Sequence, residues 1–347
     1  MPGGLLQTLR ERLFLVRLWR ANGFGAVRRH LRDRHQNHCQ ILSRHPAVVL
    51  LVWGRDDLIL HQRLRNIPLT ILYLFFWNVE TRDIAPIVEH VRARQSEFPR
   101  HRLAFLCNEE PLVATLQAAG LTALFCNHNA FCNEHILRPD PQVPKKFDAV
   151  YNASMATYKR HALAAGIPSL ALITYRNPAL HDHAYEATVR ASLPHAFWAN
   201  DERAGAPLTR PEVVHLLNQS HVGLCLSDVE GAMFSSMEYL LCGLPVVSTP
   251  SKGGRAVFWD DRFVIVCEPD AASVARAVEE LKQRHLDPQL IRQATLERIE
   301  AHRRRLREFL QPAVPAIEIP WTPDGFRYRK LPEVTRELLS AHAQATR

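Results

Sequence analysis

Short apolar runs rich in β-branched residues recur along this chain, at intervals that leave room for a helix between them. A first series lies at 47–53, 69–76, 103–107 and 122–126, and a second at 148–153, 169–175, 195–199, 221–227, 245–249 and 263–267. Continuous apolar strands separated by helices are typical of parallel sheets covered on both faces. Because 347 residues exceed the size at which one hydrophobic core usually keeps growing, the two series predict two doubly wound α/β domains.

Helix-length amphipathic segments separate the strands. The clearest are 83–98, 110–119, 158–165, 210–219, 270–284 and 289–311. A stretch rich in Asn, His and Pro at 127–147 marks the linker between the domains. We therefore expect a basic helical segment, an N-terminal Rossmann-like domain, a C-terminal Rossmann-like domain and a tail that packs back on the N-terminal domain, with bounds 1–45, 46–145, 146–311 and 312–347.

The first 45 residues hold most of the positive charge. They contain nine arginines against one glutamate and one aspartate, whereas the whole chain has a net charge of +8. Leu5, Leu9, Leu13 and Val16 follow helical spacing, which predicts one or two basic amphipathic helices. Such a segment either binds an anionic partner such as a membrane surface, or packs on the protein with its arginines in solvent.

The apolar runs of the sequence are too short for a membrane-spanning helix, which needs about 20 residues. The longest, 46–53 and 67–77, fit buried strands. Arginines interrupt residues 1–20, where a signal peptide needs a continuous apolar core. We expect a cytoplasmic protein that can bind peripherally to a membrane through residues 1–45.

The seven cysteines are odd in number and lack a C-x-x-C pair, so we expect them to be reduced core residues. Cys126, His128, Cys132 and His135 carry the side-chain types that bind zinc, but at irregular spacing. A zinc site is the lesser alternative for these four residues.

Two glutamates frame a helix-like run in EGAMFSSMEYLLCGLPVV, residues 230–247. Glu230 and Glu238 are eight positions apart, which is about 12 Å along an α-helix. At that separation two carboxylates neither share a proton nor bind one metal ion. We expect them to hold opposite ends of one extended ligand; a solvated Glu230 and an arginine-paired Glu238 are the alternative without a function.

The longer string LCLSDVEGAMFSSMEYLLCGLPVVSTPSKGG, residues 224–254, resembles the carboxyl-terminal domain of retaining GT-B glycosyltransferases of the GT4-like group, the glycosyl transferases group 1. That signature has a glutamate, seven residues, a second glutamate, and a C-G-x-P-V-V strand followed by a glycine pair. The resemblance implies that Glu230 contacts hydroxyls of the donor sugar and that Glu238 binds the ribose hydroxyls. It also implies that Gly253 and Gly254 lie in a loop near the donor sugar, with a plain turn as the alternative.

Positive charge for a diphosphate is expected at two places. The amides of Phe234, Ser235 and Ser236 begin a helix and carry the positive end of its dipole. The segment 151–165 resembles the strand-loop-helix that supplies cations to the leaving diphosphate in this family, and Lys159 matches its lysine. Arg160 stands where the family usually has glycine, and is either a substitute cation or a surface residue.

The chain departs from the family pattern at several positions. The family's E-G-F-G is E-G-A-M here, so Met233 makes a site of close backbone approach bulkier, and the glycine-rich loop after the first strand is reduced to Gly54. His128 follows an expected strand end, where ligands of open α/β sheets gather. It is our candidate for contacting donor or acceptor hydroxyls, with an exposed loop histidine as the alternative.

Together these features predict a GT-B fold, with two Rossmann-like domains facing a cleft. The resemblance implies hexosyl transfer from a nucleotide-diphosphate sugar with retention of configuration, without a metal cofactor, and with Glu230, Lys159 and His128 as catalytic candidates. The acceptor would be a lipid-linked glycan for cell-surface glycan or glycolipid synthesis, then a soluble glycan or protein. Nucleic acid comes last because aromatic residues are sparse among the arginines. A non-catalytic GT-B scaffold is the alternative from another class.

Overall fold

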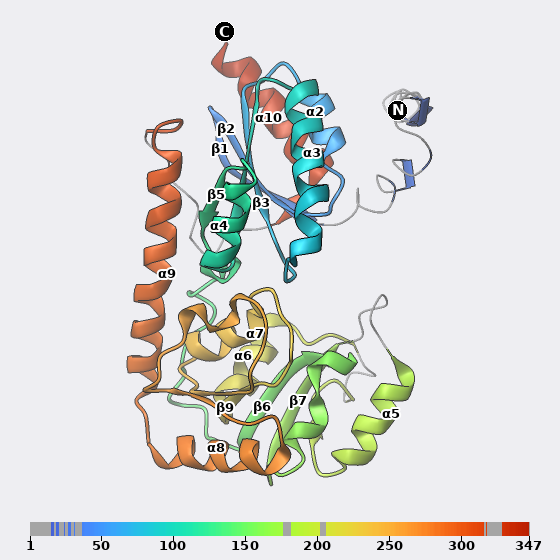
Figure 1. Ribbon diagram of the computed structural model, residues 1–347. Helices are drawn as coiled ribbons and strands as arrows, with labels where there is room; N and C mark the ends of the chain where they lie inside the picture. Colours follow the sequence, from blue (N-terminus) through green and yellow to red (C-terminus); the bar gives the residue numbers. More distant parts are fainter. Residues whose placement is uncertain are drawn as a thin grey trace, which may run out of the picture.

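The computed structural model describes residues 37–175, 182–201, 206–315, 317 and 328–346, together with 15–16, 19–20, 24, 27–28 and 31. These residues form two α/β domains, one above the other in Figure 1. None of the helices described there is long and apolar enough to cross a membrane.

The first domain contains a six-stranded sheet in the order β12-β1-β2-β3-β4-β5. Strands β2 to β5 run parallel to one another. Its elements are β1 (Asn37–Arg44), β2 (Ala47–Val52), α2 (Leu58–Arg63), β3 (Leu69–Leu74), α3 (Ile84–Glu97), β4 (His101–Cys107), α4 (Glu110–Ala118), β5 (Ala123–Phe125), β12 (Arg329–Lys330) and α10 (Leu331–Ala345).

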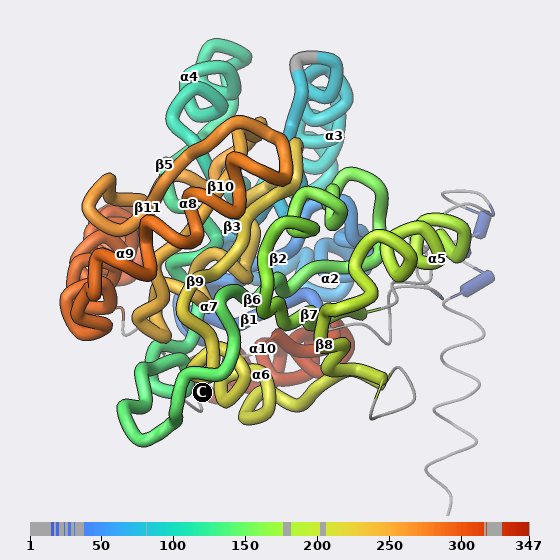
Figure 2. The backbone as a smooth tube through the Cα atoms, turned by 90° about the horizontal axis from the view of Figure 1, so that it is seen from below, coloured from blue at the N-terminus to red at the C-terminus, as the bar shows by residue number. Residues whose placement is uncertain are grey.

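The second domain contains a parallel sheet in the order β11-β10-β9-β6-β7-β8. Figure 2 shows α5 and α9 on opposite sides of the molecule, beyond the β8 and β11 edges of this sheet. Its elements are β6 (Phe147–Ser154), β7 (Leu170–Tyr175), α5 (His183–Ser192), β8 (Phe197–Trp198), α6 (Arg210–Asn218), β9 (Ser220–Cys225), α7 (Phe234–Leu241), β10 (Val246–Ser248), β11 (Val264–Val266), α8 (Ala271–Gln283) and α9 (Pro288–Leu310).

The end of the segment expected to be helical is a strand instead. Residues 37–44 form β1, which pairs antiparallel with β2 on one side and with β12 on the other. The prediction was wrong here because polar residues hide an alternating pattern: Cys39 and Ile41 face one core cluster, and Leu42 faces the other. The rest of the 1–45 segment lies largely outside the described residues.

The carboxyl-terminal residues lie on the first domain. Strand β12 extends its sheet at β1, and α10 packs on the same face as α2, α3 and α4 through Leu331, Val334 and Leu338. Residues 318–327, within the tail expected at 312–347, lie outside the described residues.

Helix α9 runs beside both domains (Figure 1). Its first half contributes Ile291 and Ile299 to the core of the second domain. Its second half contributes Leu306 and Leu310 to the face of the first sheet opposite α2 and α3. Residues at the carboxyl ends of strands in both sheets meet at the interface, such as Phe76 after β3 and Ser154 at the end of β6.

Candidate functional site

A cavity of about 430 Å³ lies where the two domains meet, at the carboxyl ends of the strands. Open α/β sheets bind ligands at this end. The first domain lines it with Phe76, Trp77 and His128, and the second with Asn152, Ser154, Tyr158, Lys159, Tyr175, Glu230, Met233, Phe234, Ser235 and Glu238. Both glutamates chosen from the sequence therefore face one cavity, as do Lys159 and His128.

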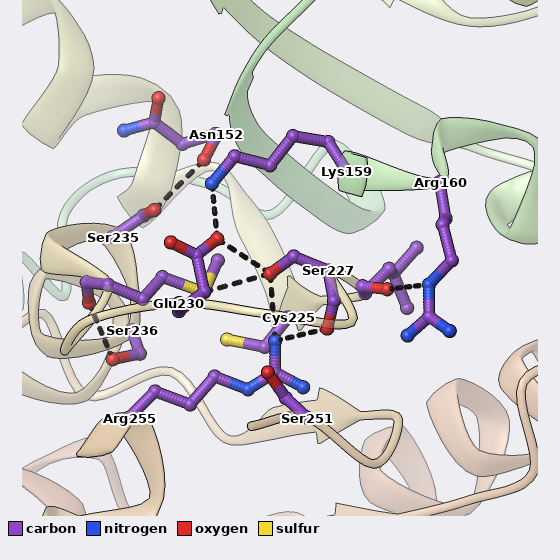
Figure 3. Close-up of polar contacts among 12 residues, drawn as sticks. Asn152, Lys159, Arg160, Cys225, Ser227, Glu230, Ser235, Ser236, Ser251 and Arg255 are labelled. Atoms are coloured by element: carbon purple, nitrogen blue, oxygen red, sulfur yellow. Dashed lines mark hydrogen bonds and ion pairs between the residues drawn. The ribbon is translucent and has the colours of Figure 1, made fainter. Parts of the chain in front are cut away.

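Glu230 lies in the loop between β9 and α7, and its carboxylate is almost fully buried. The Lys159 ammonium forms an ion pair with its Oε1 atom, and Ser227 Oγ donates to the same oxygen at 2.6 Å (Figure 3). Among the described residues, Oε2 has no hydrogen-bond partner. The loop thus holds the carboxylate by one oxygen and leaves the other for a ligand.

The turn that carries Lys159 is not the α-helix expected at 158–165. Two 3-10 turns, Thr157–Lys159 and His161–Ala164, are separated by Arg160, whose φ is +52°. The Arg160 guanidinium supports this left-handed conformation by donating to the Leu226 carbonyl and to Thr249 Oγ1, both at 2.7 Å. Lys159 then points at Glu230 while Arg160 turns away from it and does not line the cavity (Figure 3).

Glu238 lies one helical turn inside α7 and is held from two sides. Asn152 Nδ2 donates to its Oε2 at 2.8 Å, and Arg210, the first residue of α6, forms an ion pair with its Oε1. The arginine pairing that we gave as the alternative for Glu238 is therefore present. A carboxylate has about four acceptor positions, so these two donors still leave room for two hydroxyl groups.

The start of α7 lies between the two glutamates. Met233 precedes the helix with φ +55°, in the position where the E-G-F-G pattern has its second glycine. Phe234 and Ser235 line the cavity, whereas Ser236 is buried and both its amide and its hydroxyl donate to the Met233 carbonyl. The amides available to an anion at this end are thus those of Phe234 and Ser235 rather than that of Ser236.

His128 is buried between the rings of Phe76 and Phe234, at centroid distances of 5.0 and 4.5 Å. Burial lowers the pKa of its imidazole to about 4. The ring is therefore neutral near pH 7, and Nδ1 donates to the Phe75 carbonyl at 3.0 Å. Nε2 is then an acceptor without a partner among the described residues, which suits the hydroxyl group of a ligand.

Gly253 and Gly254 lie where backbone segments approach one another closely. Neither residue lines the cavity. A β-carbon on Gly254 would lie 2.3 Å from the carbonyl oxygen of Asn108 in the first domain. A β-carbon on Gly253 would lie 1.7 Å from the Glu230 carbonyl oxygen. Both residues therefore allow a close backbone approach beside the Glu230 loop.

Replacing Gly253 with alanine is expected to lower the free energy of unfolding by about 3 kcal/mol or more, because the clash adds to the strain of its φ of +97°. Gly120→Ala is the matched control: φ there is +81° with no atom within 4 Å, so only the strain of about 1 kcal/mol remains. Urea denaturation measures both. Equal losses in the two variants would contradict the importance of the close approach.

The sequence analysis did not predict most of the aromatic and polar side chains that line the cavity. Trp77 packs edge-on against Tyr158 across the domain interface, at 5.3 Å between ring centroids. Burial raises the pKa of Tyr158 to about 12, so its phenol stays protonated. Trp77 and Tyr175 end or follow expected strands, and this position was the only signal for them.

Cys126, His128, Cys132 and His135 have separate surroundings. Cys126 Sγ contacts the His302 carbonyl, burial raises the pKa of the Cys132 thiol, and His135 lies beside Glu134. In the part of the chain that the structure describes, no group of three or more His, Cys, Asp or Glu side chains is placed to bind a metal ion.

The fold and the cavity define a class. Two parallel-rich α/β domains that face each other across a cavity form the GT-B fold of glycosyltransferases. Residues 176–311 match a family model described as glycosyl transferase-like, so the second domain is glycosyltransferase-like in sequence as well. No curated protein sequence is significantly similar to the chain.

Solved structures with this fold include the following three, each of low sequence identity to this chain. Sucrose-phosphate synthase from Thermosynechococcus elongatus is 14% identical, with a TM-score of 0.56, over 78% of this chain and 74% of that one. The UDP-forming α,α-trehalose-phosphate synthase of Burkholderia xenovorans is 12% identical (TM-score 0.53; 76% and 73%). Anabaena HepE, solved with UDP, is 13% identical (TM-score 0.51; 74% and 82%).

Proposed function

We propose that this protein transfers a hexosyl group from a nucleotide-diphosphate sugar to an acceptor hydroxyl with retention of configuration. The observation that carries the proposal is that Glu230 and Glu238 face one cavity on either side of the start of α7, with Lys159 paired to Glu230. The match of residues 176–311 to a glycosyl transferase-like family supports it, as does the fold shared with a protein solved with UDP.

Each part of the donor has a chemically suited partner. Glu238 would accept the two ribose hydroxyls, since charge-assisted hydrogen bonds to a carboxylate are strong. The amides of Phe234 and Ser235 would bind the diphosphate at the helix start. The unpaired Oε2 of Glu230 would accept a hydroxyl of the sugar, and His128 Nε2 another, of the sugar or of the acceptor.

The chemical step needs cationic stabilisation more than a nucleophile. The C–O bond between the sugar and the diphosphate breaks, the acceptor oxygen attacks from the face that the diphosphate leaves, and a phosphate oxygen takes the acceptor proton. Lys159 would stabilise the charge that develops on the diphosphate. We propose that this lysine makes a metal ion unnecessary.

For the acceptor we propose a lipid-linked glycan at a membrane surface, in the synthesis of a cell-surface glycan or glycolipid. Among the described residues of the basic segment, Val16, Trp19, Phe24 and Leu31 are exposed, and Trp and Phe suit a lipid interface. Sedimentation with anionic and with neutral vesicles tests this proposal. Binding to neither kind would leave a soluble glycan, a protein or nucleic acid as the acceptor.

A thermal-shift screen with UDP, GDP, ADP and CMP tests nucleotide binding, because a ligand that binds only the native state raises its stability. Donor hydrolysis with the matching nucleotide sugars then tests chemistry. The rival function, a non-catalytic GT-B scaffold, is favoured by the side chain of Met233 in the cavity and by Arg210 on Glu238. If the protein neither binds a nucleotide nor hydrolyses a nucleotide sugar, the result favours the scaffold function.

Glu238→Ala is expected to weaken binding of the nucleoside diphosphate that the screen selects by about 100-fold or more, because two hydrogen bonds to a charged group are lost. Isothermal titration should show a smaller loss for the 2′-deoxynucleotide, which keeps only one of the two hydroxyls that Glu238 would accept. Glu300→Ala is the control, since Glu300 is also paired with an arginine on a helix but lies on α9. An unchanged affinity in Glu238→Ala would remove the ribose role.

A further inference from the structure

Arg255 is the largest fully buried side chain that the structure describes. It lies in the 3-10 turn Gly254–Phe258, directly after the glycine pair. Among the described residues, no carboxylate lies within ion-pair distance of its guanidinium. A buried cation without a direct counterion is costly, so its contacts need an explanation.

The guanidinium joins the loops that follow two neighbouring strands. Nη1 donates to the carbonyl and to the hydroxyl of Ser227, after β9, both at 2.8 Å. Nη2 donates to Ser248 Oγ at 2.9 Å and to the Thr249 carbonyl, at the end of β10. All four hydrogen bonds go to neutral oxygen atoms. They satisfy the donors of the guanidinium, but they do not explain why a positive charge is buried here.

The Ser227 hydroxyl links this cation to Glu230. Ser227 Oγ donates its single proton to Glu230 Oε1 at 2.6 Å, so it can only accept from Arg255 (Figure 3). The positive charge strengthens that donation, because hydrogen bonds in such a chain polarise one another. Lys159 binds the same carboxylate oxygen from the other side. Glu230 is therefore fixed by two cations, one direct and one through a hydroxyl.

We propose that Arg255 is a positioning residue of the donor-sugar site, which acts through Ser227 to orient the Glu230 carboxylate with Oε2 facing the cavity. This inference rests on the proposed function, in which that oxygen accepts a hydroxyl of the sugar. Arg255 itself would not contact the ligand, since it does not line the cavity.

The experiment compares a nucleotide sugar with its nucleoside diphosphate. Isothermal titration measures the dissociation constants of UDP-glucose and UDP, or of GDP-mannose and GDP if the thermal screen selects guanosine. The variants are Ser227→Ala, Arg255→Met, Arg255→Lys and the double Ser227→Ala/Arg255→Met. Arg94→Met is the control for loss of an arginine from a largely buried ion pair, because Arg94 pairs with Asp57 in the first domain and does not line the cavity.

We expect Ser227→Ala and Arg255→Met each to change the ratio of the two dissociation constants by about tenfold against the nucleotide sugar, with UDP affinity changed by less than about threefold. The double variant should be no worse than the more affected single one, since both changes break one chain of hydrogen bonds. Arg94→Met should keep the ratio. Arg255→Lys should change the ratio by less than Arg255→Met does, because one ammonium group cannot reach both strand ends.

A ratio kept in Ser227→Ala overturns the inference, and does so even if Arg255→Met fails to fold. If Arg255→Met weakened the binding of UDP and of UDP-glucose by the same factor, Arg255 would have a structural role alone. If the effects of the two single changes on the ratio multiplied in the double variant, Ser227 and Arg255 would act independently. Either result would contradict the inference. If the wild-type protein binds no nucleotide, the proposed function fails first and the inference falls with it. Wild-type binding with an unchanged ratio in the variants overturns the inference only.

Discussion

Glu230→Gln is expected to lower the rate of sugar transfer or donor hydrolysis by about 100- to 1000-fold, the range seen when one preorganised polar contact is removed from an active site. Glutamine keeps the shape of the side chain. Its amide oxygen can still accept from Lys159 and Ser227, which hold Oε1 now. The group facing the cavity would then be an NH₂, which donates where the sugar hydroxyl needs an acceptor.

Steady-state kinetics on the donor that the screen identifies measure this loss, and titration with the nucleoside diphosphate alone should show little change. Asp228→Asn is the matched control: it removes a carboxylate from the same loop, but the Asp228 side chain is exposed and does not line the cavity. A Glu230→Gln variant within threefold of the wild-type rate would refute the assigned role, as would an equal loss in Asp228→Asn.

Lys159→Met is expected to reduce the rate by about 100-fold or more, because the diphosphate would lose its stabilising cation. It should also destabilise the fold by roughly 3–5 kcal/mol, since the buried Glu230 carboxylate would lose its directly paired cation. Stability is measured by urea denaturation, and kinetics are measured at a temperature where the variant is folded.

Lys282→Met is the control, because Lys282 also pairs with carboxylates, Asp148 and Glu279, but on α8. The double variant Lys159→Met/Glu230→Gln should recover stability relative to Lys159→Met, since the neutral amide tolerates the missing cation. If Lys159→Met turned over the donor normally, the diphosphate would need another cation, and the proposed mechanism would have to be abandoned.

The fold class was predictable because parallel strands buried on both faces appear as continuous apolar runs, and the prediction of two doubly wound domains in a GT-B arrangement is confirmed. Strand β1 was missed because it does not appear as a continuous apolar run. In NHCQILSR the buried residues include His38 and Gln40, whose polar side chains hide the strand. Hydrophobic periodicity cannot find a strand whose buried positions are polar.

The lining of the cavity was predictable where its residues are close in sequence and follow a known pattern, as with Glu230 and Glu238. It was not predictable where a contact depends on side-chain direction. Lys159 and Arg160 are adjacent and both cationic, yet the left-handed backbone at Arg160 turns only Lys159 toward Glu230. Arg255 had no sequence signal, because its link to Glu230 passes through a hydroxyl 28 positions earlier in the chain.

Helix α9 has a consequence for how the molecule folds. Leu306 and Leu310 complete the core of the first domain, while Ile291 and Ile299 complete the core of the second. We therefore expect neither half of the chain to fold stably alone: if one core unfolds, it exposes apolar surface on a helix that the other core also needs. The assembly of the cleft and the cooperative folding of the chain thus depend on the same 23 residues.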